Sequence, residues 1–353
     1  MRGLVLQGGG AKGAYEAGAI KALNKKKIYF DCACGTSIGA INAAFYSMRR
    51  CDLLNELWLE TDTEDLFGLD YRILDNFSDG IFKKSDIKKG LNFLTQTIKN
   101  NGIDTYRMKK LLHKYIDEDR IRKSKIDFAM NTYSLSDMEP VEVFKNDIPK
   151  GKLVEYLLSS AYLPFFKFEK IIDNKYYIDG GIYSDCPVDM LIDQGYKEIY
   201  VIKAWRTKIK YKHKKNLKIH IISPRENLGS IMTFTKESSI YRMNLGYYDT
   251  LKYLENLDGN KYYFKNYDEK YYSKLFDKST LKRMIIKYNK GIVPLSYKIF
   301  ILKIVERICV EFNFDRFKVY NMPYLLTRLK YKMVGHRKNK YYDFIKNIKV
   351  DFE

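Results

Sequence analysis

Apolar and polar positions along the first 258 residues form two alternating patterns. Short apolar runs at residues 2–7 and 31–34 are typical of buried strands, and each precedes a segment with helical periodicity, at 14–25 and 37–48. The apolar face of the second helix comprises Ile38, Ile41, Phe45 and Met48. Strands that alternate with helices in this way predict an α/β fold.

Further elements continue the alternation. Strands are predicted at residues 125–133, 141–144, 175–178, 198–204 and 217–222. Helices are predicted at 104–115, at 153–162, which Pro164 terminates, and from the capping residue Ser85 through Ile87, Leu91, Leu94 and Ile98. We therefore expect one α/β domain over residues 1–258.

The composition changes near the turn-forming sequence Asp258-Gly259-Asn260. The chain has 63 Lys and Arg against 43 Asp and Glu, a net charge of +20, and residues 261–353 contain 22 and 9 of these, a net of +13. Amphipathic helices are predicted there at 281–288 and 299–310. We expect residues 259–353 to form a basic, mainly helical region, whose charge favours anionic partners such as membrane headgroups or nucleic acid.

Composition also limits the class of protein. Hydrophobic residues at 46% and charged residues at 30% exclude collagenous and wholly disordered chains. The first apolar run stops at Gln7, so no signal peptide is expected, and no run is long enough for a transmembrane segment. The five cysteines are scattered without metal-binding spacing, which favours free thiols and a cytoplasmic protein. Export without a cleavable signal would leave the same pattern.

A glycine-rich loop between the first strand and the first helix is one candidate for a functional site. It consists of Gly8, Gly9, Gly10, Ala11, Lys12 and Gly13. Backbone N–H groups in such a loop can turn toward an anion at the positive end of the helix dipole. The loop also fits the dinucleotide pattern G-x-G-x-x-G, with Asp31 near the distance of a ribose-binding acid. Asp31, however, enters the second strand instead of standing at its carboxyl end, which argues against that interpretation.

A second candidate lies between the next strand and helix, in the sequence Gly35-Thr36-Ser37-Ile38-Gly39. This is the G-x-S-x-G pattern of a nucleophile elbow, where glycines flank a serine because its sharp, strained turn leaves no room for neighbouring side chains. The strand-turn-helix context that the motif requires is predicted here. Ser37 is therefore a candidate nucleophile, and a helix-capping loop serine is the alternative.

A third candidate is Asp179-Gly180-Gly181, which directly follows an apolar run. Two glycines after a carboxylate at a strand end leave the side chain uncrowded and let the backbone turn away. Asp-Gly is also an ordinary turn dipeptide, so the motif is weak by itself. Its weight comes from occurring together with the glycine loop and the elbow.

The three motifs, in this order, resemble the patatin-like phospholipase family over about residues 1–258. Two further blocks are similar to the family's S-A-x-x-P and G-Y-x-D segments: residues 159–166, SSAYLPFF, and 246–251, GYYDTL. Lys12 stands where the family usually has Arg, and Asp185 where it usually has Asn. The resemblance implies a three-layer α/β/α fold with flanking helices and a lipid acyl hydrolase that needs no cofactor.

By this resemblance Ser37 would attack an acyl ester while Asp179 accepts its proton, and an acyl-enzyme would then be hydrolysed. The N–H groups of Gly9 and Gly10 would hold the oxyanion, with Ala11 as a further donor and Lys12 adding positive potential. A free Asp with a pKa of about 3.9 is a poor base, so burial beside Ser37 must raise its pKa or couple its protonation tightly to the attack. No acidic cluster resembles a calcium site, and we expect no metal.

Three alternatives remain. A Ser-His-Asp triad would need one of the four histidines, His113, His213, His220 and His336, of which His220 on a predicted strand is the nearest candidate. A dinucleotide oxidoreductase would leave Ser37 and Asp179 unexplained. A non-enzymatic lipid- or nucleic-acid-binding protein would rest on the basic region alone, where aromatic residues alternate with lysines. Because the N-terminal part resembles a lipid hydrolase, we expect peripheral association with anionic membranes and no nucleic acid partner.

Overall fold

A computed structural model of the chain describes residues 1–68 and 102–350. The chain forms two compact units, Met1–Thr250 and Leu251–Glu353, here called the N-terminal and C-terminal units. The division falls inside helix α11 (Lys236–Glu255), whereas the sequence predicts a boundary after the end of that helix. The helix predicted from Ser85 to Ile98 lies outside the described residues.

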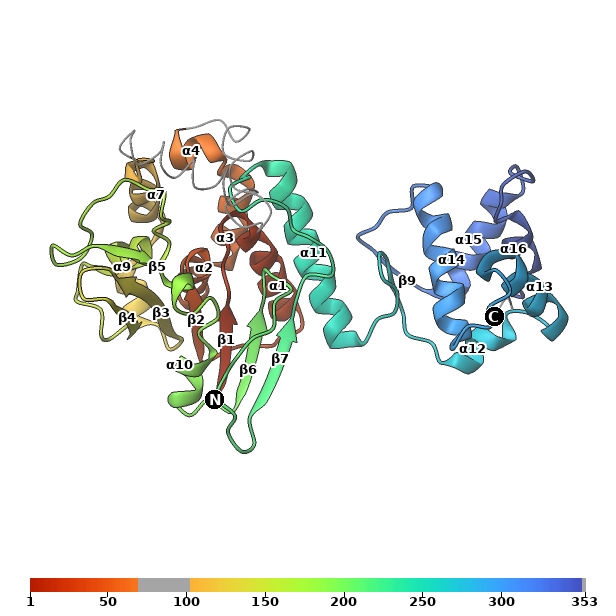
Figure 1. Cartoon of the computed structure of the whole chain (residues 1–353), viewed down its shortest axis with the longest axis horizontal. Helices are drawn as coiled ribbons and strands as arrows, with labels where there is room; N and C mark the ends of the chain where they lie inside the picture. Colours follow the sequence, from red (N-terminus) through yellow and green to blue (C-terminus); the bar gives the residue numbers. More distant parts are fainter. Residues whose placement is uncertain (69–101, 351–353) are drawn as a thin grey trace. The chain divides into compact units, whose positions relative to one another are not determined.

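The N-terminal unit is built on a seven-stranded sheet (Figure 1). Its strands are β1 (Arg2–Leu6), β2 (Cys32–Thr36), β3 (Asp127–Ser134), β4 (Glu139–Phe144), β5 (Tyr177–Asp179), β6 (Glu198–Ile202) and β7 (Lys218–Ile222). The order is β4-β3-β2-β1-β6-β7, and β5 also pairs with β3. Strands β3, β2, β1, β6 and β7 are parallel, while β4 and β5 run antiparallel to β3. Each strand predicted from the sequence overlaps one of these, with ends that differ by one or a few residues.

Helices cover both faces of this sheet, which explains why its central strands are apolar at nearly every position. The crossovers through α1 (Gly13–Lys25) and α2 (Ile38–Ser47) step from β1 to β2 to β3 in one direction. The connection through α10 (Val188–Asp193) returns to β6 in the opposite direction, and α10 packs on the other face: Cys34 of β2 contacts Met190 of α10, whereas its neighbour Gly35 faces α2. Val5, Cys34 and Val201 lie in the apolar cluster that α10 covers. The prediction of an α/β fold with three α/β/α layers is confirmed.

Several further helices surround the side of the sheet where α2 lies. They are α3 (Cys51–Glu60), α4 (Thr63–Phe67), α7 (Tyr106–Tyr115), α8 (Glu118–Lys123) and α9 (Leu153–Ser160). The sequence analysis did not predict α3, α4 or α8, nor α10 on the opposite face. Leu54 and Trp58 of α3 and Phe67 of α4 are buried, and α7 packs against both α4 and α9. These helices enclose a pocket that is described below.

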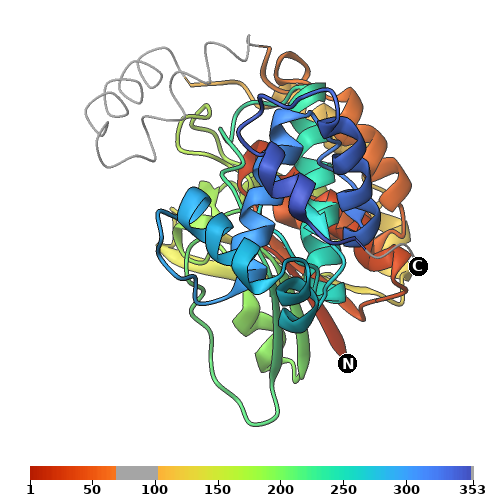
Figure 2. The same cartoon turned by 90° about the vertical axis from the view of Figure 1, so that its right-hand side faces the viewer.

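The C-terminal unit is mainly helical, as Figure 2 shows. It contains α12 (Glu269–Lys274), α13 (Lys278–Asn289), α14 (Tyr297–Glu311), α15 (Met322–Met333) and α16 (Tyr342–Asn347), and a short parallel pair of β8 (Tyr263–Phe264) and β9 (Val319–Tyr320). The two predicted amphipathic helices fall within α13 and α14. Phe264, Ile301, Leu325 and Phe344 belong to a core of this unit's own. Among the described residues, no helix combines the length and the apolar character needed to cross a membrane.

Candidate active site

Strand register brings two of the predicted site residues together. Strand β2 pairs with β3 in parallel and ends with Thr36 opposite Asn131. Strand β5 approaches from the other direction and ends with Asp179 opposite Thr132, the next residue of β3. The two strand ends therefore face each other along one edge of β3. Ser37, the residue after β2, consequently lies beside Asp179.

The turn at Ser37 has the geometry of a nucleophile elbow. Ser37 has φ 58° and ψ −133°, a conformation that L-residues rarely adopt, between β2 and α2. Its N–H donates to Ser160 Oγ at 2.9 Å, and the Ser160 hydroxyl donates to the Asn131 carbonyl at 2.7 Å. A Cβ on Gly39 would lie 2.4 Å from the Leu6 carbonyl oxygen, so only glycine fits there. Ser160 belongs to the block that resembles S-A-x-x-P, and its side chain stabilises the strained turn.

The glycine loop lies directly against this elbow. Gly8 has φ 79°, and a Cβ there would lie 2.2 Å from the Thr36 carbonyl oxygen. Its N–H donates to Glu16 Oε1 at 2.6 Å. The N–H of Ala11 donates to the Ile231 carbonyl at 2.7 Å, so the expected further oxyanion donor is already engaged.

The other N–H groups of the loop differ in availability. The N–H of Lys12 donates to the Gly9 carbonyl. The N–H of Gly13, the C-cap residue of the 3₁₀ turn η1 (Gly10–Lys12), donates to carbonyl groups of that turn. Among the described residues no acceptor is recorded for the N–H groups of Gly9 and Gly10. Gly9 and Gly10 are thus the two donors that the loop can offer to a substrate.

The electrostatic environment of Asp179 suits a general base. The residue is 8% exposed, and its carboxylate accepts hydrogen bonds from the Gly181 N–H at 2.8 Å and from the Ser37 side chain. Burial raises the pKa of Asp179 from 3.8 to about 6, and the two hydrogen bonds limit that rise. A carboxylate with this pKa is ionised at neutral pH and still accepts a proton far more readily than an exposed aspartate.

A lysine and a tryptophan form the other side of the site. Lys12 is buried, and its ammonium group lies 3.2 Å from the centre of the Trp205 ring. Trp205 follows β6, and its backbone N–H donates to Gln7 Oε1. The side-chain amide of Gln7 donates to Asp185 at 2.8 Å. The ammonium group expected to add positive potential at the site thus lies against an indole ring. The sequence analysis did not identify Trp205 or Gln7.

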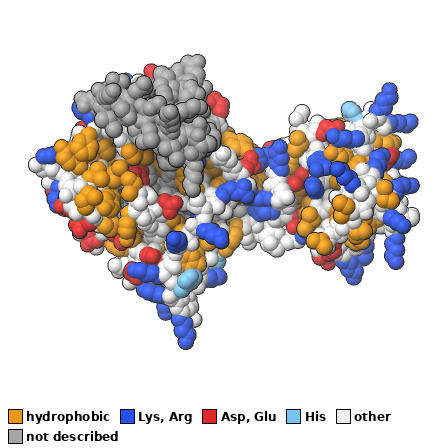
Figure 3. All heavy atoms as spheres, in the orientation of Figure 1, with side chains coloured by type: hydrophobic (Ala, Val, Ile, Leu, Met, Phe, Trp, Pro, Cys, Tyr) orange, Lys and Arg blue, Asp and Glu red, His pale blue; other side chains and the backbone are white. Residues whose placement is uncertain are grey.

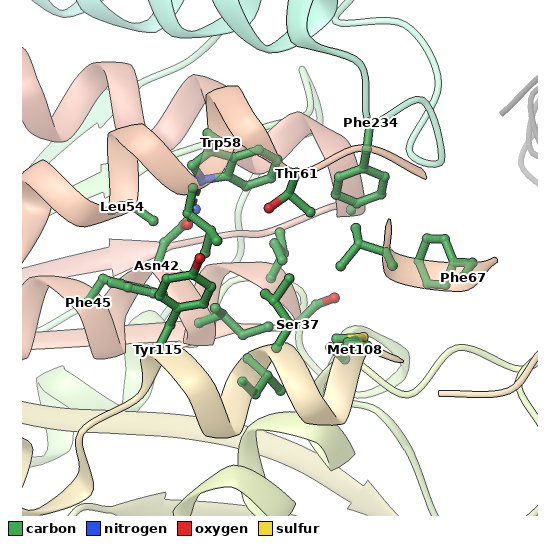
Figure 4. A pocket seen from close by; sticks show the side chains of 18 of the residues that line it. Ser37, Asn42, Phe45, Leu54, Trp58, Thr61, Phe67, Met108, Tyr115 and Phe234 are labelled. Atoms are coloured by element: carbon green, nitrogen blue, oxygen red, sulfur yellow. Dashed lines mark hydrogen bonds between the residues drawn. The ribbon is translucent and has the colours of Figure 1, made fainter. Parts of the chain in front are cut away.

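Two pockets meet at Ser37, and Figure 4 shows the first of them. The first contains about 790 Å³ of empty space and is bounded by α2, α3, α4 and α7. Its apolar walls include Phe45, Leu54, Trp58, Phe67, Met108 and Phe234. The second, of about 1200 Å³, is a more polar cleft that includes Asp179 and Trp205. Gly10, Ser37 and Leu163 border both pockets, so a molecule held at Ser37 could extend an apolar part to one side and a polar part to the other.

A buried network of hydrogen bonds stabilises the glycine loop. Glu16 of α1 accepts hydrogen bonds from the Gly8 N–H and, at 2.7 Å, from the amide of Asn42 in α2. Asn42 in turn accepts one from the indole N–H of Trp58 at 3.1 Å. Burial raises the pKa of Glu16 to about 7. The sequence analysis missed this network, although Glu16 and Asn42 each lie between apolar residues of their helices, which was the available signal.

The geometry disfavours both enzymatic alternatives. Within the described part of the chain, the residues that line the two pockets at Ser37 include no histidine. His220 on β7 instead stacks on Tyr200, with ring centres 4.0 Å apart, and bonds to Glu198. Asp31 accepts a hydrogen bond from the N–H of Arg2 at the amino end of β1. It therefore lies at the opposite edge of the sheet from the glycine loop, where a bound ribose could not reach it.

A strained serine beside a buried carboxylate, at the carboxyl edge of a mainly parallel sheet and next to an apolar pocket, is an arrangement typical of serine hydrolase sites. The comparison with protein families agrees. The chain belongs to the patatin-like phospholipase family, whose model matches residues 4–192.

Curated relatives carry names from the same family. A patatin-like phospholipase domain-containing protein of Caenorhabditis elegans is 51% identical over 45 residues, which are 13% of this chain and 4% of that protein. Lysophospholipase NTE1 of Mycosarcoma maydis is 25% identical over 201 residues, 57% of this chain and 9% of that protein. The match thus spans less than a tenth of either relative. Among solved structures, VipD from Legionella pneumophila aligns with 97% of this chain and 82% of its own, at 15% identity and a TM-score of 0.42.

Proposed function

We propose that the chain hydrolyses carboxylic esters of phospholipids or lysophospholipids, with Ser37 as nucleophile and Asp179 as general base. Its main support is the register of the sheet, in which Thr36 and Asp179 lie opposite consecutive residues of β3 and Ser37 directly follows Thr36. The hydrogen bond between their side chains and the raised pKa of Asp179 agree with these roles. The family assignment supplies the reaction class.

In the proposed reaction Ser37 Oγ attacks the ester carbonyl carbon, and Asp179 takes the hydroxyl proton. The oxyanion that forms on the carbonyl oxygen accepts hydrogen bonds from the Gly9 and Gly10 N–H groups, and Lys12 adds positive potential. The carbon–oxygen bond to the leaving alcohol then breaks, and the alcohol takes the proton from Asp179. A water molecule repeats the sequence on the acyl-enzyme, which releases the fatty acid and the free serine.

The two pockets suggest how a lipid ester would lie. We place the acyl chain in the apolar pocket that α2, α3, α4 and α7 bound. The glycerol and headgroup would lie in the polar cleft beside Asp179 and Trp205. This arrangement puts the ester carbonyl at Ser37, on the border that both pockets share.

We also infer that the C-terminal unit brings the enzyme to anionic membranes. The net charge of +13 over residues 261–353 supports a peripheral association. A lipid substrate gives such an association a purpose, because the reaction takes place where the lipid is.

The decisive test is the release of fatty acid from a panel of lysophospholipids, phospholipid vesicles and glycerides by the full-length protein, with Ser37→Ala as the control. A fluorophosphonate probe should label the wild type at Ser37 and leave Ser37→Ala unlabelled. Labelling at another residue, or equal hydrolysis by both proteins, would exclude Ser37 as the nucleophile.

A further inference from the structure

The connection between α13 and α14 in the C-terminal unit carries exposed aliphatic side chains at its tip. Ile292, Val293 and Leu295 are 67%, 71% and 108% exposed. Single exposed aliphatic residues are common on protein surfaces, but three within four residues form a patch that needs an explanation. Figure 3 shows apolar side chains on the visible face of this unit, next to many Lys and Arg.

Both ends of this connection are anchored. Helix α13 ends with Lys290 at φ 54° and Gly291 at φ 77°, and Asn289 donates from its side chain to the Ile292 carbonyl at 2.6 Å. Helix α14 begins with the capping residue Ser296, whose hydroxyl accepts a hydrogen bond from the Ile299 N–H at 3.1 Å. The tip is thus presented by two capped helices and is not a loose tail.

The apolar surface extends onto both helices. Ile286, in the last turns of α13, is 59% exposed, and Ile299, in the first turn of α14, is 66% exposed. Lys282 and Lys290 lie four residues to either side of Ile286, and Lys303 lies four residues after Ile299. Residues four apart share a helix face, so lysines accompany the exposed isoleucines.

The stretch of sequence that contains the tip is basic, and the carboxylate of Glu269 accepts hydrogen bonds from the Ser296 hydroxyl and the Tyr297 N–H at the start of α14. Between Lys278 and Val305 the sequence contains seven Lys and Arg and no Asp or Glu. Lys287 pairs with Asp343 and Lys298 with Asp258. Within the described residues Lys282, Lys290 and Lys303 form no ion pair, so their charge is available to an anionic partner.

We propose that residues 291–295 insert into the acyl region of an anionic lipid bilayer while the unpaired lysines of α13 and α14 contact its headgroups. An apolar tip with lysines behind it matches the layered polarity of a membrane interface. A protein partner fits less well, since a convex tip offers no pocket for a partner's side chain. The proposal names the residues that make the inferred contact with the membrane. It rests on the proposed function only in that a lipid substrate gives a reason for such a contact.

The test compares full-length proteins that all carry Ser37→Ala, so that binding is measured without turnover. One protein has Ile292, Val293 and Leu295 replaced by serine. The matched control has Met138→Ser and Phe168→Ser, which remove equally exposed apolar side chains, 70% and 71%, from the N-terminal unit. Co-sedimentation is measured with phosphatidylcholine vesicles with and without 30% phosphatidylserine.

We expect the triple serine variant to bind the anionic vesicles at least about tenfold more weakly than the control, since burial of each aliphatic side chain is strongly favourable. In a second measurement, fluorescence of Val293→Trp should be quenched by brominated acyl chains well beyond the quenching of the parent protein. Equal binding by the triple variant and the control, or no added quenching, would overturn insertion. A parent protein that is a dimer and becomes a monomer in the triple variant would also overturn insertion, because the tip would then be an interface between copies. Failure of the hydrolysis assay would not change any of these binding results.

Discussion

Replacement of Asp179 by asparagine should abolish activity and at the same time stabilise the fold. Asparagine has the same shape, and its side-chain oxygen can still accept the hydrogen bond from the Gly181 N–H. It cannot accept a proton from Ser37 at neutral pH, so catalysis should be lost. Removal of a buried negative charge should at the same time remove the free-energy cost of keeping it ionised.

The size of this stabilisation follows from the pKa of Asp179, which rises from 3.8 to about 6 on folding. At 1.36 kcal/mol per pH unit, ionised Asp179 lowers the free energy of unfolding by about 3 kcal/mol at pH 8. The cost appears as the pH rises from about 4 to 6 and is constant above that range, because the folded state holds the proton more tightly than the unfolded state. At pH 4.5 only about 1 kcal/mol of it should remain.

Urea unfolding of both proteins at pH 8 and pH 4.5, followed by tryptophan fluorescence, measures this difference. Both tryptophans of the chain, Trp58 and Trp205, lie in the N-terminal unit, so the signal reports the unit that contains the site. We expect Asp179→Asn to be more stable by up to about 3 kcal/mol at pH 8 and by about 1 kcal/mol at pH 4.5. A difference that does not depend on pH would refute burial of the charge as the source of the raised pKa.

Substitutions at three other positions test the surroundings of the site. Glu16→Ala should lower the free energy of unfolding by about 2–4 kcal/mol at pH 6, because it leaves two buried donors without an acceptor. Glu16→Gln should lower it by less than half as much. Equal losses of stability in urea titrations of the two variants would exclude the network. His220→Ala should keep most of the esterase activity, and a thousandfold fall in kcat with an intact fold would instead support a triad. Leu111→Trp should narrow the apolar pocket and reduce kcat/KM at least about tenfold for C16 relative to C4 p-nitrophenyl esters; an unchanged ratio would place the acyl chain elsewhere.

The sequence predicted the positions where chemistry requires an unusual backbone. Ser37 and the glycines around it could be recognised because a strained turn and close backbone contacts restrict the residue types that fit. Asp179 could be recognised only together with the other motifs, and its position at the end of β5 follows from pairing with a strand about 50 residues earlier. Local patterns also predicted the strands well, because their apolar runs reflect burial on both faces.

The residues that support the site could not be predicted in the same way. Ser160 holds the backbone of Ser37 across 123 residues of sequence, and Glu16 contacts Asn42 across 26. Such contacts depend on how the helices pack, which no local pattern encodes. The expectation that the Ala11 N–H would donate to the oxyanion failed for the same reason. Nothing in the sequence shows that this N–H donates to the Ile231 carbonyl.

The pairing of β2 and β5 with neighbouring residues of β3 has a consequence for how the enzyme can change. The spacing of Ser37 and Asp179 depends on backbone hydrogen bonds within the sheet, not on the length of chain that joins them. That same stretch of chain supplies α3, α4 and α7, which form a large part of the wall of the apolar pocket. Insertions or exchanges in those helices can therefore change the shape of the apolar pocket while Ser37 and Asp179 keep their positions. Under the proposed function, substrate range and chemistry can evolve separately in this architecture.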